Sequence, residues 1–124
     1  MEDELYRQNI LDHNRNPRNY GKLSVCDIRE SGKNANCGDD VTLYIKFGNN
    51  DIVSEISFDG YGCAISKAGA SMLTEYAKGK SIDELRSTTE DDIYKMFGVQ
   101  INPGRKNCAL LAYKTLQKIL KKYA

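Results

Sequence analysis

The chain has no strong excess of either charge and no long apolar run. Its 124 residues include 18 basic and 17 acidic side chains, which leaves a formal net charge of +1. Such a balance gives no electrostatic reason to bind nucleic acid or an anionic membrane surface. The apolar runs fall far short of the roughly 20 residues that a membrane-spanning helix requires. We therefore predict a protein that binds neither nucleic acid nor membrane.

A secretory leader and closely paired cysteines are also missing. The first four residues are largely acidic, which is the opposite of the basic start of a signal peptide, so we expect a cytoplasmic protein. In that compartment, the four cysteines are more often metal-binding or catalytic than joined in disulfides. No cysteine lies within three residues of another, which excludes zinc-finger pairs of the C-x-x-C kind.

Hydrophobic periodicity predicts a single α+β domain over residues 1–124. Helices are expected over 2–13, 64–78 and 106–122, with two short ones opening at Ser81 and Thr89. Strands are expected over 23–31, 41–47 and 52–59, the last two joined by a hairpin turn. Because the strands precede most of the helices, we predict a small antiparallel sheet of about three strands packed against several helices.

Three of the cysteines occur at turns, each where a helix or strand is about to begin. These are Cys37, Cys63 and Cys108, and Asp39 follows the first of them by two residues. Cysteines that serve only packing usually lie among apolar residues inside helices and strands. The pattern therefore predicts a metal site with three sulfur ligands and one oxygen ligand. Thiolates suit zinc and iron–sulfur clusters, and a carboxylate in place of a fourth cysteine is a harder, more exchangeable ligand.

The local sequence favours the thiolate form at two of these positions. Cys63 follows a glycine-rich turn and directly precedes a helix, so it should face the partial positive charge of the helix N-terminus. Cys108 lies in the first turn of the last helix, just after Arg105 and Lys106. We expect a lowered pKa for both thiols.

Three further residues could be mistaken for ligands. Cys26 lies in the irregular first strand and is expected to be a buried structural cysteine. His13, the only histidine, lies on the apolar face of the first helix and is expected to serve packing or hydrogen bonding. Asp40 is expected to be a turn or capping residue.

Four sequence segments together resemble one known family. They are Tyr6–His13 running into Asn16–Gly21, then Cys37-Gly38-Asp39, then Gly60–Ser66 followed by Ala68–Met72, and finally Arg105–Leu111. In this order and spacing they resemble the iron–sulfur cluster assembly scaffolds of the IscU/SufU/NifU N-terminal family. The resemblance covers nearly the whole chain.

The resemblance implies a function that spacing alone does not. In this family a cysteine desulfurase passes persulfide sulfur to the scaffold, iron joins it, and a [2Fe-2S] cluster forms and moves on to apo-proteins. The cluster ligands would be Cys37, Cys63 and Cys108, and Asp39 matches the family aspartate that acts at the site and favours release. Such a protein is a carrier rather than an enzyme, and it can form homo-oligomers.

Three departures from the family pattern bear on this hypothesis. Asn107 stands where many IscU members carry a histidine, so the fourth ligand falls to Asp39 or an added group. Ile101–Arg105 replaces the chaperone-binding Leu-Pro-Pro-Val-Lys segment, which argues against a dedicated Hsp70 partner. The insertion typical of SufU between Cys63 and Cys108 is absent.

Two alternatives therefore stay open. In the first, the protein is a SufU-type sulfur-transfer protein with Zn2+ on Cys37, Asp39, Cys63 and Cys108, one cysteine of which accepts the persulfide. In the second, it is a structural zinc domain that loses its fold when the metal is removed.

Overall fold

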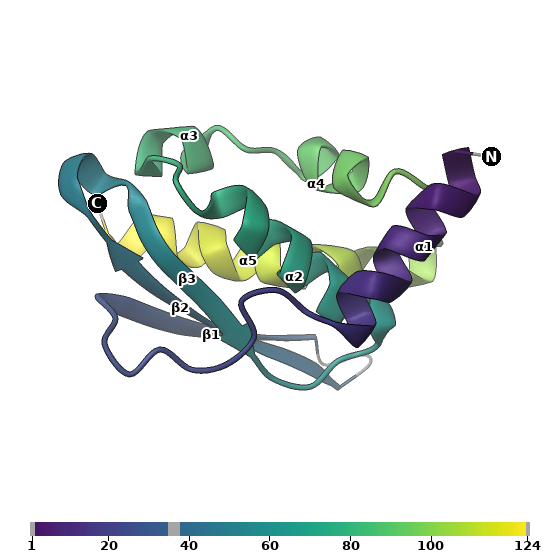
Figure 1. The fold of residues 1–124 in the computed structure, drawn as a ribbon, viewed down its shortest axis with the longest axis horizontal. Helices are drawn as coiled ribbons and strands as arrows, with labels where there is room; N and C mark the ends of the chain where they lie inside the picture. The colour runs from purple at the N-terminus through teal and green to yellow at the C-terminus, as the bar shows by residue number, and fades with distance from the viewer. Residues whose placement is uncertain (1, 35–37, 124) are drawn as a thin grey trace.

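A three-stranded antiparallel sheet carries helices on one face (Figure 1). The computed structural model describes residues 2–34 and 38–123. The strands, in spatial order, are β1 (Ile28–Asn34), β2 (Asp39–Phe47) and β3 (Val53–Asp59). The helices are α1 (Glu2–Arg15), α2 (Ala64–Ala77), α3 (Ile82–Arg86), α4 (Glu90–Phe97) and α5 (Lys106–Lys122), with short 3-10 turns at η1 (Asn49–Asp51) and η2 (Pro103–Arg105). The predicted α+β architecture is confirmed.

The central strand β2 sets the register of the sheet. Its alternating apolar residues turn toward the helices, and Leu43 and Ile45 are completely buried. They lie opposite Phe58 and Ile56 of β3, so apolar side chains from neighbouring strands meet on the same face. A one-residue slip would move this apolar set to the other face, which is why the pattern fixes the pairing.

The first strand was predicted in the wrong place. It runs over Ile28–Asn34 instead of 23–31, and residues 23–27 belong to the connector that follows α1. β1 has little apolar alternation. Pairing with β2 and direct contact with α5 hold it in place instead. A Cβ on Gly32 would lie 2.1 Å from Thr115 Oγ1, so only glycine lets α5 approach the strand this closely.

Cys26 also differs from its prediction. It lies in the connector before β1 rather than in a strand, and it is half-buried rather than buried. The prediction failed because it depended on the misplaced strand.

Helices α2 and α5 pack against each other at a small residue. A Cβ on Gly69 would stand 3.1 Å from the carbonyl oxygen of Ala109, a closer contact than most side chains tolerate. The two predicted short helices are present as α3 and α4, each opened by a capping box, at Ser81 and Thr89. No helix within residues 2–34 and 38–123 has the length and apolar character needed to cross a bilayer.

His13 connects α1 to α2 by packing and hydrogen bonding, as predicted. Its ring is 4% exposed, and Nδ1 lies 2.7 Å from Ser71 Oγ. The same hydroxyl oxygen accepts a 2.8 Å hydrogen bond from the Arg18 backbone N–H, so three segments meet at Ser71. Burial lowers the pKa of His13, and the charge of Arg18 adds to this effect against the opposing charges of Glu75 and Asp12.

Acidification should therefore weaken the fold through His13. An unfolded histidine has a pKa near 6.5, so below about pH 6.5 the unfolded chain binds the proton more readily than the native one, and stability falls. We expect the free energy of unfolding, measured with urea, to drop between pH 7 and pH 5. His13→Gln should cost roughly 1–3 kcal/mol at pH 7 and should show a shallower drop. Equal slopes in the two proteins would contradict this role.

Candidate metal centre

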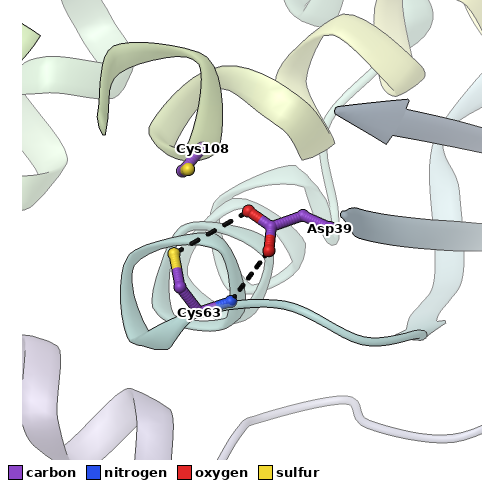
Figure 2. A group of neighbouring side chains, drawn as sticks. All are labelled: Asp39, Cys63 and Cys108. Atoms are coloured by element: carbon purple, nitrogen blue, oxygen red, sulfur yellow. Dashed lines mark hydrogen bonds between the residues drawn. The ribbon is translucent and has the colours of Figure 1, made fainter. Parts of the chain in front are cut away.

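Three of the four predicted ligands lie side by side at the ends of three different elements (Figure 2). Asp39 begins β2, Cys63 is the residue that precedes α2, and Cys108 lies in the first turn of α5. One ligand atom from each lies within 4.8 Å of the other two. The fourth predicted ligand, Cys37, lies outside the described residues.

A glycine-rich loop brings Cys63 to the end of β2. Gly60 has φ +134°, and a Cβ there would lie 2.4 Å from the carbonyl oxygen of Asp40, so the close approach requires glycine. The Asp40 backbone N–H donates to the Tyr61 carbonyl at 2.7 Å, and the Tyr61 N–H donates to Asp40 Oδ1 at 3.2 Å. Asp40 thus lies within β2 and ties the loop to it, whereas the sequence predicted only a turn or capping residue.

The Asp39 carboxylate is held by the N-terminus of α2. The residue is 4% exposed. Its Oδ1 accepts a 3.1 Å hydrogen bond from the Cys63 backbone N–H, and its Oδ2 accepts a 2.6 Å hydrogen bond from the Ser66 hydroxyl. The Cys63 thiol sulfur lies 3.8 Å from the same Oδ2. Two hydrogen bonds from a single helix end therefore fix the orientation of the carboxylate.

Cys108 is enclosed more deeply than Cys63. It is 1% exposed, and the Asn34 side-chain amide donates toward its sulfur at 3.7 Å. Asn34 lies directly opposite Asp39 in the β1–β2 pairing. Sequence reasoning missed both Asn34 and Ser66. The available signal for Asn34 was its place at the end of a strand. For Ser66 it was the position three residues after Cys63.

The Cys63 thiol has a pKa below its ordinary value, as its position before a helix predicted. Burial is the largest single influence and opposes ionisation, but hydrogen bonds from the Ser66 backbone and hydroxyl, helped by the Cys108 thiol, outweigh it in sum. The backbone of Ile65 contributes in the same direction. The thiolate is the nucleophilic and metal-binding form of cysteine, so this setting favours both uses.

The three ligand atoms face a cavity of about 470 Å³ that opens to solvent. Its wall includes the loop around Gly62 and the turn around Gly104, with Arg105 at its edge. Tyr61 stands at the rim and is 81% exposed. Asn107, at the family's histidine position, is also exposed. A partner could therefore reach the half-buried Cys63 from outside without unfolding the protein, whereas Cys108 is buried.

The donor set suits a thiophilic metal. Zinc bonds are about 2.3 Å long to sulfur and 2.0–2.2 Å to a carboxylate oxygen, so two ligands of one tetrahedral ion lie roughly 3.5–3.8 Å apart. Asp39, Cys63 and Cys108 come near this spacing, since their ligand atoms are within 4.8 Å of one another. Soft thiolates with one carboxylate suit zinc or an iron–sulfur cluster rather than magnesium or calcium.

Comparisons with known proteins point the same way. Residues 5–124 match the model of the NifU-like N terminal domain. The iron–sulfur cluster assembly scaffold protein IscU of Thermotoga maritima is 34% identical, and the alignment covers 95% of this chain and 94% of IscU. The zinc-dependent sulfurtransferase SufU of Bacillus subtilis is 38% identical, with 94% and 89% covered.

A solved structure shares the fold closely. A crystal structure from Fervidobacterium islandicum, described as an iron–sulfur cluster assembly scaffold protein for the SUF system, superposes with a TM-score of 0.80. It is 31% identical, and the match covers 91% of this chain and 94% of that one. The chain therefore belongs to the NifU-like N-terminal domain family of iron–sulfur cluster assembly scaffolds, in which IscU and SufU proteins are its relatives.

Proposed function

We propose that this protein is a scaffold that builds [2Fe-2S] clusters and passes them to apo-proteins. The observation that carries the proposal is the convergence of two thiols and one carboxylate in an open cavity. The proposed cluster ligands are Cys37, Cys63 and Cys108, with Asp39 as the exchangeable fourth ligand. Residues 1–124 would act as one scaffold domain that turns over no small-molecule substrate.

Sulfur would arrive from a cysteine desulfurase as a persulfide. A scaffold thiolate attacks the terminal sulfur of that persulfide, the sulfur–sulfur bond breaks, and the desulfurase cysteine leaves as a thiolate. Cys63 is the best-suited acceptor among the described cysteines, because its pKa is lowered and its sulfur faces the open cavity. Reduction of the transferred sulfur to sulfide then draws two electrons from an external donor.

A second candidate function has its own support. The 38% identical Bacillus subtilis relative is a zinc-dependent sulfurtransferase, and the donor set fits one tetrahedral zinc as well as it fits iron. On this proposal Zn2+ is held by Cys37, Asp39, Cys63 and Cys108, and one of the cysteines accepts the persulfide. A cysteine desulfurase is a partner in both cases, whereas apo-protein acceptors are partners only of the scaffold.

The cellular setting follows from the same chemistry. Both functions need free thiols, which persist in the reducing cytoplasm, so we place the protein there. Association into homo-oligomers is compatible with the scaffold function, because a larger cluster could then be shared between subunits.

Anaerobic reconstitution separates the two functions. The protein is incubated with ferrous iron, cysteine, a cysteine desulfurase and a thiol reductant, then desalted and assayed for metal, acid-labile sulfide and visible absorption. The scaffold function predicts about two iron and two sulfide per site. Cys63→Ser should abolish cluster formation, and Cys26→Ser is the matched control because Cys26 lies in the connector. One tightly held zinc that blocks cluster formation would favour the sulfurtransferase instead.

Asp39 should set how readily the cluster leaves. A carboxylate exchanges more easily than a thiolate, so it gives an acceptor cysteine a place to attack. We expect Asp39→Ala to retain the cluster longer and to transfer it several-fold more slowly to an apo-ferredoxin. The measurement is the change in visible absorption or circular dichroism during transfer. An unchanged transfer rate would assign cluster lability to another group.

Metal removal should leave the fold intact. The core consists of apolar side chains of the sheet and the helices, and of the described ligands only Cys108 is buried among apolar residues as part of it. After chelation, far-UV circular dichroism should keep its native shape, and the thermal transition should persist at a lower Tm because bound metal stabilises by mass action. Loss of the helical signal would instead indicate a structural zinc domain.

A further inference from the structure

Ser66 touches all three described members of the site, although its hydroxyl is no ligand in the proposed set. It is the third residue of α2 and is 7% exposed. Its hydroxyl lies 2.6 Å from Asp39 Oδ2, 3.3 Å from the Cys108 carbonyl oxygen and 3.8 Å from the Cys63 sulfur.

The hydrogen bond from Ser66 to Asp39 orients the carboxylate oxygen that faces the thiols. Oδ2 receives the Ser66 hydrogen bond and is also the oxygen near the Cys63 sulfur, while Oδ1 is turned toward the Cys63 backbone N–H (Figure 2). Without the hydroxyl, Oδ2 loses the hydrogen bond that it receives from α2, and the orientation of the carboxylate is less firmly set. A metal-binding carboxylate generally depends on such an outer partner for its orientation.

The Ser66 hydroxyl has a second hydrogen-bond acceptor, so it stays paired when Asp39 moves. When Oδ2 turns toward a metal ion, the hydroxyl can donate to the Cys108 carbonyl oxygen at 3.3 Å. A buried donor without an acceptor would cost free energy, so the second acceptor keeps the free-energy cost of this movement small. The Ser66 hydroxyl therefore orients Asp39 before metal binding and keeps a hydrogen-bond acceptor if Oδ2 turns to the metal.

We propose that Ser66 is the positioning residue of Asp39, presenting Oδ2 to the two sulfurs and thereby setting the affinity of the site for metal. The inference rests on the proposed function only in taking Asp39 as a ligand. It assigns Ser66 no direct bond to the metal and no role in cluster chemistry. Its effect on metal affinity should then pass mainly through Asp39, and the 3.8 Å contact between its hydroxyl and the Cys63 sulfur is a weaker second route.

A double-mutant cycle tests this dependence. The proteins are the wild type, Ser66→Ala, Asp39→Ala and the double variant, each as the full chain. Zn2+ alone is the probe, and its affinity is measured under anaerobic conditions by competition with a chromophoric chelator. Ser66→Ala should weaken zinc binding by about tenfold or more in the presence of Asp39. In the Asp39→Ala background the same change should have a much smaller effect, because only the contact to the Cys63 sulfur is then lost.

Ser71→Ala is the matched control. Ser71 is another fully buried serine of α2, but its hydroxyl contacts His13 and the Arg18 backbone rather than the site. This variant should lower the thermal stability and leave the zinc affinity unchanged. Cobalt in place of zinc adds a spectroscopic readout, because its visible bands should shift in Ser66→Ala and not in Ser71→Ala. Ser66→Thr keeps a hydroxyl at this position and should bind zinc nearly as tightly as the wild type, so it tests the role if Ser66→Ala does not fold.

Three results would overturn the proposal. They are an unchanged or tighter zinc affinity in Ser66→Ala, an equal loss of affinity in the Asp39→Ala background, and an equal loss in Ser71→Ala. None of these results depends on iron, sulfide or a desulfurase. A wild type that binds zinc but forms no cluster would therefore contradict the scaffold function alone, and a failed cycle with normal cluster assembly would contradict Ser66 alone.

Discussion

The site depends on one junction, the pairing between the start of β2 and the N-terminus of α2. The Asp39 carboxylate accepts hydrogen bonds from the Cys63 backbone and the Ser66 hydroxyl, and Asp40 pairs with the backbone of Tyr61. These bonds join residues 21–27 positions apart in the sequence, and they bring a carboxylate against a thiol. Everything proposed here about metal binding, sulfur acceptance and release requires this junction to form first. Packing of the apolar core then brings α5, and with it Cys108, to the same place.

The architecture explains how a site can be both well ordered and accessible. Two of its members come from the first residues of long helices, and the third comes from the end of a strand, so each is placed by rigid structure. The loops around Gly62 and Gly104 line the opening of the cavity beside them. Cys108 and Asp39 are buried, whereas Cys63 is half-buried and Tyr61 is exposed at the rim. Of the two site cysteines that the structure describes, Cys63 is therefore the one that a docking partner would meet first.

Much of the fold could be predicted from the sequence, because its strongest signals are local. The apolar alternation around Leu43 and Ile45 predicts a strand without reference to distant residues. The caps at Ser81 and Thr89 predict the starts of two helices in the same way. β1 could not be placed, since it is stabilised by its neighbours and by the space above Gly32 rather than by an apolar pattern. At the site, the turn positions of Cys63 and Cys108 were informative and the two sulfurs do lie near Asp39. The roles of Ser66 and Asn34 depend on contacts between distant segments, which no local pattern encodes.

The close approach of α2 and α5 at Gly69 has an electrostatic consequence. Both helices begin at the cavity, so two positive dipole ends are directed at the same small volume. A cluster held by thiolates and a carboxylate would be anionic, and this built-in field would compensate part of its charge, together with Arg105 in the cavity wall. Because Arg105 is exposed, a departing anion would leave no buried cation of this residue behind. Two helix ends and a solvated arginine would thus favour the loaded site without penalising the empty one through a buried charge.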